Sequence, residues 1–356
     1  MAGALVAGLW LIPSFQNASS LHATAAALCA LSTLYFIVWG RRWVVRMVAA
    51  GIAVAICIGG NQAIKPLTRG VYEQWTELER RNSPFGLMQI LQSKLTPQRA
   101  LINDFLMQNS YDPQTRHSLL AFSYMEHGLA RAYHTNANSV LVIGMGVGIV
   151  PGAFAEEGAR VDTVEINPAY VDLGVKYFDL DTNKFRIFIE DGRYFMRRSQ
   201  SRYDLVIMDA FLGDSPPSHL MTRESFESAR QLLNSDGLFV LNSFGDFDLA
   251  PDPFFLASMH KTLAAVFRTV KIHSTGNGNV FFVASMRETL EMQQRPSLRK
   301  VHATKVPEVR KGYANMITTD PAHGMVLTDD YNPVEVRDAR NRERIRRAMA
   351  EAVRKF

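Results

Sequence analysis

Glycines and carboxylic acids recur at the ends of short apolar runs in the middle of the chain. Along the sequence these are Gly144, Gly146 and Gly148 after 140–143, Glu165 within 161–166, Asp191-Gly192 after 185–189, and Asp209 after 203–208. Glycines let the backbone turn tightly and approach a ligand closely. A carboxylate 21 residues after Gly144 can accept both hydroxyls of a ribose. An acid after the next run can bind an adenine amino group. The spacing predicts a nucleoside site.

The elements that must position these residues alternate in type. The apolar runs predict strands at 140–143, 161–166, 185–189, 203–208 and 237–241, and the stretches between them predict helices at 151–157, 169–178, 194–198 and 223–233. Such alternation is typical of a parallel sheet covered on both faces, with ligands bound beyond the carboxyl ends of the strands. We expect a Rossmann-like α/β fold of the S-adenosylmethionine-dependent methyltransferase type. NAD is the rival ligand, but no second βαβαβ half is visible.

Further elements flank this core. A helix is expected at 257–267, followed by a hairpin of strands 269–273 and 280–284 around Gly276-Asn277-Gly278. Strands at 86–91 and 100–107 predict a small β-unit, and 119–133 predicts a helix that leads into the first central strand. The expected organisation is a membrane segment at 1–60, a linker and β-unit at 61–112, the nucleoside-binding domain at 113–300, and an extension with a basic helix at 301–356.

Charge is concentrated at the two ends of the chain. The net charge is +5, with +3 in residues 1–60 and +5 in residues 336–356, so the middle sums to −3. This distribution gives no reason to expect nucleic-acid binding. The two cysteines, Cys29 and Cys57, lie in apolar N-terminal stretches, which excludes a disulfide framework and a thiolate zinc site in the rest of the chain. No motif indicates a metal site, a serine or cysteine triad, or a phosphate loop.

The first 60 residues contain no acid and predict membrane insertion as two or three helices. Leu21–Gly40 suits a hydrocarbon core of about 30 Å, and the shorter run Met47–Gly60 follows it. The alternative is a buried hairpin of core helices. Arg41, Arg42 and Arg46 favour a cytoplasmic loop, which would place the large domain outside if the second run crosses fully. Because adenosyl cofactors are made inside cells, we expect a multi-pass inner-membrane protein with a cytoplasmic catalytic domain.

Several segments resemble the spermidine synthase (polyamine aminopropyltransferase) family, in particular its bacterial membrane-fused members. The resemblance covers about residues 83–335 and rests on Ser83-Pro-Phe-Gly86, Asn103–Gln108, Ser123-Tyr-Met-Glu126, Val140–Gly148, Val164–Pro168, Glu190-Asp-Gly192, Tyr203–Asp209 and Leu327–Glu335. Family members transfer an aminopropyl group from decarboxylated S-adenosylmethionine to putrescine in polyamine biosynthesis. Many of them self-associate, so the resemblance also implies a homo-oligomer.

The resemblance implies a role for each matching residue. Asp209 would be the catalytic base that takes a proton from the attacking amine, and the flanking Asp214 with Tyr124 would position that amine. Gln108 and Glu126 would contact the amine substrate. The glycine loop with Glu165, Asp191 and Gly192 would hold the nucleoside. The co-substrate is then decarboxylated S-adenosylmethionine or S-adenosylmethionine itself, and no metal is expected.

The chain departs from the family where the family binds amines. The glycine-loop acid that holds the amine of the co-substrate is replaced by Val147, and the spacing from Asp209 to Asp214 is wider than in the family. Leu120-Ala121 stands where an Asp-Glu pair precedes the Tyr motif, and Gly86 replaces a Gln. These changes leave two alternatives open: an S-adenosylmethionine-dependent methyltransferase, and a non-catalytic nucleoside sensor at a membrane. Glu126, Asp214 or Asp330 are candidates to compensate for the missing charge.

Other features have competing interpretations. His219 suits a proton relay or an ordinary loop histidine. Asp329-Asp330 suits the cleft or a turn. The basic tail carries an apolar stripe of Ile345, Met349, Val353 and Phe356, which suits a lipid-binding helix or a solvated one.

Overall fold

A computed structural model describes most of the chain, in two compact units: Met1–Lys94 and Leu95–Lys355. The described residues are 2–11, 14–15, 17–40, 42–69, 74–104, 106–211, 217–246, 253–276, 278–340, 342–344 and 347. Arg41, Asp214 and the tail residues Ile345, Met349, Val353 and Phe356 therefore lie outside the described part of the chain. The four segment boundaries expected from the sequence stay predictions.

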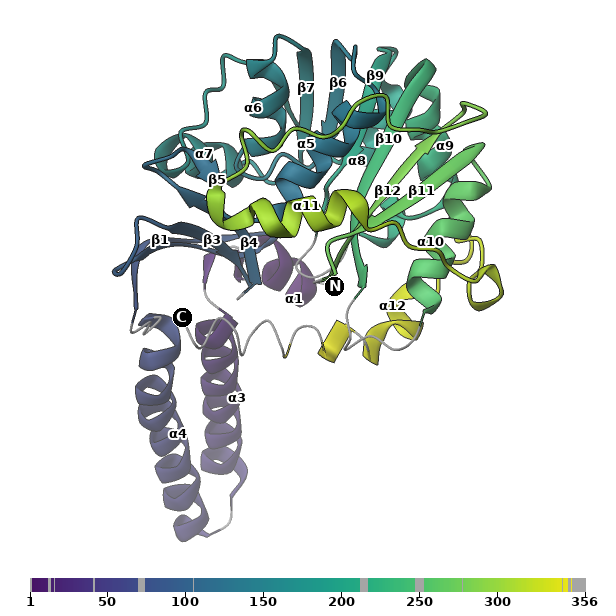
Figure 1. Ribbon diagram of the computed structural model, residues 1–356. Helices are drawn as coiled ribbons and strands as arrows, with labels where there is room; N and C mark the ends of the chain where they lie inside the picture. The colour runs from purple at the N-terminus through teal and green to yellow at the C-terminus, as the bar shows by residue number, and fades with distance from the viewer. Residues whose placement is uncertain are drawn as a thin grey trace. The chain divides into compact units, whose positions relative to one another are not determined.

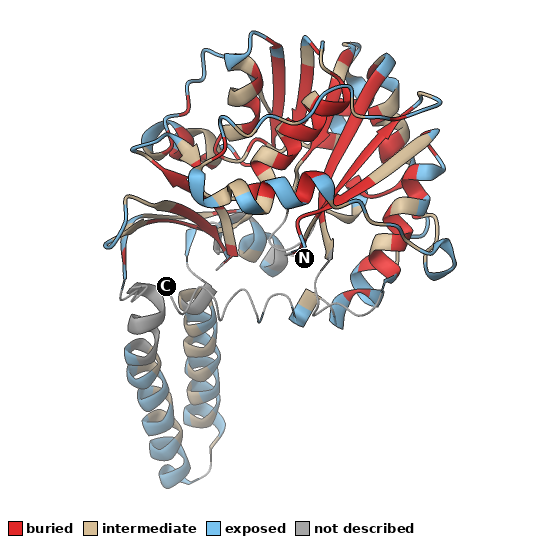
Figure 2. Cartoon of the chain, in the orientation of Figure 1, coloured by how far each residue is buried: buried red, intermediate tan, exposed pale blue. Residues whose placement is uncertain are grey.

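The first unit contains a helical hairpin and a β-hairpin. Short helices α1 (Ala2–Val6) and η1 (Ala7–Leu11) precede the long helices α3 (Asn17–Trp39) and α4 (Trp43–Arg69), which pack side by side (Figure 1). Two spans within this hairpin, Ser19–Trp39 and Trp43–Gly60, are long and apolar enough to cross a membrane, and neither is buried within the protein. Figure 2 shows α3 and α4 without buried positions among their described residues.

Strands β1 (Trp75–Ser83) and β2 (Gly86–Ser93) pair antiparallel in the first unit. The sequence predicted β2 but not β1, whose run Trp-Thr-Glu-Leu-Glu-Arg-Arg-Asn-Ser is highly charged. The charges are neutralised within the hairpin, because Arg80 forms a bidentate ion pair with Glu77 at 2.5 and 2.7 Å. Gln89 on β2 also donates to Glu77, at 3.2 Å.

The second unit begins with a strand pair that the sequence only partly predicted. The single strand expected at 100–107 is wrong: the chain forms β3 (Arg99–Asn103) and β4 (Leu106–Asp112), which pair antiparallel. Asp104 between them adopts a left-handed conformation with φ 46°. Asn and Asp tolerate this conformation better than other non-glycine residues, so Asn103-Asp104 is a turn signal inside an apolar run. β5 (His117–Ser118) then pairs with β4.

The main body is a seven-stranded mixed sheet with the order β11-β12-β10-β9-β6-β7-β8. The strands are β6 (Ser139–Ile143), β7 (Arg160–Glu165), β8 (Arg186–Ile189), β9 (Tyr203–Met208), β10 (Leu233–Asp246), β11 (Thr269–Ser274) and β12 (Gly278–Ser285). β6 to β10 run parallel to one another, and β12 runs antiparallel to both β10 and β11. The Rossmann-like methyltransferase-type fold and every central strand expected from the sequence are confirmed.

Helices cover both faces of the sheet (Figure 1). They are α5 (Ala121–Tyr133), α6 (Ile149–Glu156), α7 (Ala169–Tyr177), α8 (Gly192–Arg198), α9 (Arg223–Gln231), α10 (Phe254–Ala264), α11 (Val306–Ala314) and α12 (Val334–Arg337). Alternate strand residues enter two apolar clusters: Val140 and Val142 pack with α5 and α6, whereas Leu141 and Ile143 pack with α8, α9 and α10. Buried positions therefore occupy both faces of the strands (Figure 2).

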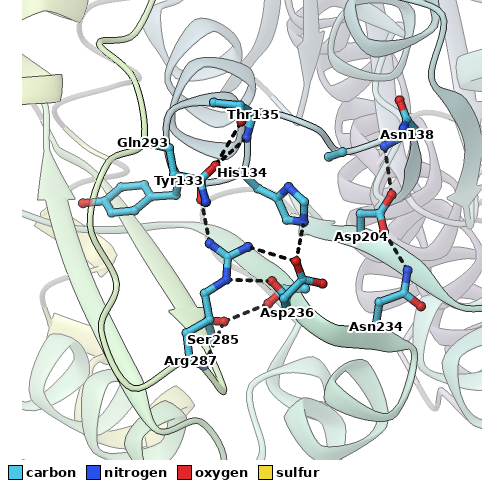
Figure 3. Close-up of polar contacts among 12 residues, drawn as sticks. Tyr133, His134, Thr135, Asn138, Asp204, Asn234, Asp236, Ser285, Arg287 and Gln293 are labelled. Carbon is cyan, nitrogen blue, oxygen red and sulfur yellow. Dashed lines mark hydrogen bonds and ion pairs between the residues drawn. The ribbon is translucent and has the colours of Figure 1, made fainter.

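Polar contacts link neighbouring segments at the edge of the sheet where the parallel strands begin (Figure 3). Asp204 on β9 accepts the backbone N–H groups of Asn138 and Ser139 at 2.8 and 2.9 Å, and the Asn234 amide at 2.6 Å. Burial raises the pKa of Asp204, but these hydrogen bonds outweigh it and the net shift is downward. Arg287 donates to the carbonyl of Tyr133 at 2.8 Å (Figure 3). This edge holds α5 and the strands in register, and the opposite edge remains for a ligand.

Candidate nucleoside and amine site

A cleft of about 1040 Å³, counting its open mouth, lies at the carboxyl ends of the parallel strands. This is the edge at which open α/β sheets bind ligands. Its lining includes the sequence-predicted Gln108, Gly144, Gly146, Glu165, Asp191, Gly192 and Asp209. The residues that sequence reasoning did not single out include Phe122, Tyr170, Phe211, Asn242, Phe244 and Asn279.

The glycine loop brings two strand ends into contact. Gly144, Gly146 and Gly148 all have positive φ, at 92°, 53° and 86°. A Cβ at Gly144 would lie 2.2 Å from the carbonyl oxygen of Asp209, so only glycine fits between β6 and the end of β9. Gly144 and Gly146 line the cleft, whereas Gly148 and Val147 line a second cavity behind the loop. The glycines therefore position Asp209 as well as any bound ligand.

Glu165 lies at the carboxyl end of β7, almost fully buried in the cleft wall. One carboxylate oxygen accepts the N–H of Met145 in the glycine loop at 3.1 Å, and the other accepts the N–H of Asn167 at 2.9 Å. Burial raises the pKa of Glu165, and these N–H donors act in the opposite direction. Each oxygen keeps a lone pair, so the side chain can still accept from the hydroxyls of a ribose.

Asp191 has a structural task as well as a place in the cleft. One oxygen accepts the N–H of Tyr194 at 2.8 Å and caps α8, and the other lies 2.9 Å from Nε2 of His219. His219 is exposed but lines the same cleft. Both oxygens of Asp191 are thus oriented before a ligand arrives.

Polar contacts from the C-terminal extension stabilise this side of the cleft. Arg193 forms a bidentate ion pair with Asp329, and Thr222 donates to the same carboxylate at 2.7 Å. Asn332 donates to the carbonyl of Ser218 at 2.9 Å. Asp329 therefore fixes the segment that carries His219 and does not line the cleft.

Two acids lie close together where β9 ends; Asp209 lines the cleft and Glu126 does not. Asp209 is partly buried at the end of β9, and Asn242 donates to its Oδ1 at 2.9 Å. Burial raises the pKa of Asp209 to about 6, although the hydrogen bond from Asn242 opposes this. Glu126 on α5 is fully buried beside it. Burial raises the pKa of Glu126 well above its usual range, and the charge of Asp209 raises it further.

Tyr124 lies apart from this pair. Its phenol donates to the carbonyl of Ser118 at 2.7 Å and accepts from the N–H of His302 at 3.3 Å. It lines the second cavity with Val147, and not the cleft that contains Asp209. Phe122 takes the cleft position instead, one helical turn before Glu126. The i, i+4 spacing of Phe122 and Glu126 was the available sequence signal for this face of α5.

Comparison with known proteins now identifies the domain. Residues 121–275, which carry the glycine loop, Glu126, Glu165, Asp191 and Asp209, match the family model of the spermine/spermidine synthase domain. Residues 121–275 are thus similar to the spermine/spermidine synthase domain, and we refer to them as the synthase domain. The "Polyamine aminopropyltransferase" of Vibrio vulnificus is 28% identical to this chain over 240 residues, which cover 63% of this chain and 78% of that protein. Relatives of the synthase domain bearing this name are transferases.

The synthase domain also has a relative with a different reaction in its name. The "N-terminal histidine N-methyltransferase" of Emericella nidulans is 34% identical over 151 residues, which make up 41% of this chain and 26% of that protein. Among solved structures, a probable spermidine synthase from Corynebacterium glutamicum superimposes with a TM-score of 0.54 at 19% identity, covering 69% of this chain and 91% of that one. That likeness concerns the fold alone.

Proposed function

We propose that the synthase domain transfers an alkyl group from an S-adenosyl sulfonium compound to an amine. In the form favoured by the family, the donor is decarboxylated S-adenosylmethionine and the acceptor is putrescine or a related amine. The observation that carries this proposal is the position of Asp209, a carboxylate with a raised pKa in the cleft that also presents Glu165 and the glycine loop. Nucleoside-binding groups and a base share one cavity, as group transfer from an adenosyl donor requires.

The chemistry assigned to Asp209 is proton removal. An acceptor that enters as an ammonium ion gives one proton to Asp209 and becomes a neutral amine. The amine nitrogen then forms a bond to the carbon next to sulfur, the C–S bond breaks, and its electron pair stays on sulfur. Methylthioadenosine leaves, and the positive charge moves to the product nitrogen. A base with a pKa of about 6 is mostly ionised near neutral pH, so it is ready to accept the proton.

Aromatic side chains support a positively charged donor. Phe211 and Phe244 line the cleft close to Asp209, with ring centroids 5.1 Å apart and an interplanar angle of 56°. Phe122 lines the same cavity from α5. Aromatic faces attract cations with about 0.5–2 kcal/mol each, which suits a sulfonium or an ammonium group.

Methyl transfer from S-adenosylmethionine is a second candidate, favoured by one specific observation. The loop residue that binds the free amine of the decarboxylated donor in the family is Val147 here, and it is buried toward the second cavity. The synthase domain thus lacks that acid, and the name of the Emericella relative specifies methyl transfer to an amine of histidine. The same base and nucleoside groups serve both reactions.

We also propose that α3 and α4 cross a membrane and that the synthase domain is cytoplasmic. The support is the length and apolar character of the two helices, both with exposed surfaces. Adenosyl donors are made inside cells, which favours the cytoplasmic side.

Parallel calorimetric titrations test the reaction. Full-length protein in detergent is titrated with decarboxylated S-adenosylmethionine, S-adenosylmethionine and methylthioadenosine, and products with putrescine are analysed by mass spectrometry. Preference for the decarboxylated donor with aminopropyl product supports the first reaction. Preference for S-adenosylmethionine with methylated product transfers support to the second. No binding of any of the three contradicts both.

A further inference from the structure

Three polar side chains form a row across neighbouring strands at the floor of the cleft. Asn279 on β12 donates to Oδ1 of Asn242 on β10 at 3.3 Å, and Asn242 donates to Oδ1 of Asp209 at 2.9 Å. The two amides therefore have fixed orientations, because each hydrogen bond specifies which end of Asn242 points where. The row ends on the proposed base.

Strand register explains why these residues face the same way. Asn242 follows Leu241, which pairs with Met208, so Asn242 and Asp209 lie side by side one position further on. On the other side of β10, Asn242 pairs with Phe281 and Phe244 pairs with Asn279. Side chains alternate between faces, and the residues before or after this row, such as Met208, Leu241 and Val280, pack with the opposite cluster. The row thus faces α5.

Glu126 on α5 completes the arrangement. Its side chain has no measurable exposure, and among the described residues neither of its oxygens has a partner at hydrogen-bond distance. An unpartnered ionised carboxylate is strongly disfavoured in such a place, whereas a protonated carboxyl can donate to a neighbouring carboxylate. The neighbour is Asp209, whose charge already acts on Glu126.

We propose that Glu126 stays protonated and, together with Asn242, acts as a positioning residue that donates a hydrogen bond to the ionised Asp209. Asn279 holds Asn242 in the required orientation. The inference rests on the proposed function, and it specifies the acceptor class: the floor of the cleft carries one negative charge, from Asp209, and binds a single ammonium group there. The proton that this ammonium gives up goes to Asp209, since Glu126 already carries a proton.

Other titratable groups face this pair and enter any interpretation of pH dependence. The cleft also contains Glu165, Tyr170, Glu190, Asp191 and His219. Tyr170 on α7 is affected by the charge of Asp209, but burial raises its pKa so far that it stays neutral. From α11, Tyr313 donates to the carbonyl of Tyr124 at 2.8 Å, and burial raises its pKa too. On the α6 side, His127 and Arg131 of α5 pair with Glu157, away from Glu126.

The sign of a pH shift tests the proposal. In full-length protein, kcat is measured against pH for the wild type and for Glu126→Leu, Asn242→Leu and Glu126→Gln, with the donor that the wild type turns over. Removing a neutral donor raises the pKa of Asp209, so the acid limb should move upward by about half to one pH unit in both leucine variants. A charged Glu126 would instead raise the pKa of Asp209 in the wild type, and the limb of Glu126→Leu would move downward, which overturns the proposal.

A second test compares kcat after the conservative replacement Glu126→Gln with kcat after Glu126→Leu. Glu126→Leu should lower kcat at least tenfold, and Glu126→Gln should recover most of that loss, because its amide can donate as a protonated carboxyl does. Loss in Glu126→Gln as severe as in Glu126→Leu contradicts the proposal. Ser243→Ala, a buried change beside Asn242 and outside the cleft, is the control and should leave the profile as in the wild type.

An infrared measurement needs no turnover. The wild type near neutral pH should show the carbonyl stretch of a protonated carboxyl, and this band should be weaker in Glu126→Gln. Absence of the band in the wild type, or equal band intensity in the two proteins, rules out a protonated Glu126. If no donor is turned over, the proposed reaction fails while this measurement still decides the state of Glu126.

Discussion

At the residue scale, the burial that suits Asp209 to catalysis also lowers the stability of the folded protein at neutral pH. Its folded pKa of about 6 lies above the ordinary 3.8, so the folded state holds this proton more tightly than the unfolded state. The charge at Asp209 therefore stabilises nothing. The stabilising contribution comes from the protonated carboxyl of Asp209, is fully present below about pH 4, and is lost as pH rises through 6. A group retained at such a cost is a candidate for function.

Asp209→Asn should therefore lose activity and gain stability. We expect kcat to fall by about 10²–10⁴-fold, the usual contribution of a general base. The free energy of unfolding above pH 7 should rise by roughly 1–2 kcal/mol, because the ionised group is no longer desolvated. Turnover assays and urea titrations measure the two effects. A variant that is inactive and also less stable would assign Asp209 a structural role.

Glu165→Ala should abolish tight binding of every adenosyl ligand alike. The carboxylate is fixed by the N–H groups of Met145 and Asn167, and the two ribose hydroxyls are common to all donors. Loss of charged hydrogen bonds predicts about a 10- to 100-fold weaker Kd for S-adenosylmethionine and for methylthioadenosine. Calorimetry measures this. Asp181→Ala, an exposed acid outside the cleft, is the control. Selective weakening of one ligand would contradict a ribose contact.

The sequence predicted the residues at strand ends better than those on helices. Glu165, Asp191 and Asp209 were found because each follows an apolar run, and strand ends meet at one edge. Tyr124 was assigned to the amine through family resemblance, yet its phenol is turned toward Ser118 and His302. Helical direction depends on how α5 packs, which no local pattern specifies. Asn242 and Asn279 carry no charge and lie within strands, so only the register of β10 and β12 reveals them.

At the element scale, the loop from β6 to α6 is the most restricted connection. Gly144→Ala should impair activity through Asp209, since the new Cβ would lie 2.2 Å from the Asp209 carbonyl oxygen at a φ of 92°. We expect a loss of stability of roughly 1–3 kcal/mol and at least a tenfold loss of kcat. Gly152→Ala on α6 is the matched control, because nothing lies within 4 Å of its Cβ. It should be neutral or slightly stabilising. Equal effects of the two changes would contradict this account.

The sequence predicted the boundaries of some strands and helices better than those of others, because the local signals differ in strength. Strand β9 was predicted without error because Tyr203-Asp-Leu-Val-Ile-Met208 is bounded by polar residues. Strand β10 spans 14 residues, although only Gly237–Leu241 was expected, since its beginning, Leu-Asn-Ser-Asp-Gly, has turn composition. Leu233 pairs with Tyr203 and the pairing with β9 resumes at Leu238, so the turn-like residues lie in an irregular part of the strand. Helix α11 was not predicted, because its apolar face is short and packs on α5.

At the scale of the whole molecule, buried histidines predict sensitivity to acid. Burial lowers the pKa of His273 to about 4, below the ordinary 6.5, and its Nε2 lies 2.9 Å from the hydroxyl of Tyr133. A depressed pKa means that stability is fully present above pH 6.5 and is lost as pH falls toward 4. Burial lowers the pKa of His134 in the same way.

The wild type should lose roughly 1–3 kcal/mol between pH 7 and pH 4.5 relative to His273→Gln. Urea midpoints across this range measure the difference. Comparing the two proteins cancels the opposite contribution of Asp209, which both contain. Parallel pH curves for the two would contradict a neutral buried His273.

Introducing one charged residue into α3 tests whether this helix inserts into a membrane. Leu31→Asp, an exposed position within α3, should cost about 2.5–3.5 kcal/mol of insertion free energy and reduce the fraction that resists alkaline carbonate extraction. Val336→Asp on α12 changes an even more exposed apolar position in the other unit and should have no effect. Full extraction of the wild type by carbonate would refute the proposed spans.

The row of Asp209, Asn242 and Asn279 also implies how this site tolerates evolutionary change. Since the three residues share a face through register, a single inserted or deleted residue within β9, β10 or β12 would turn one member away and break the row. A residue inserted after Asp209 lies beyond the end of β9 and leaves this register unchanged. The consequence is that length changes within the three strands should be far more damaging than length changes that follow the base.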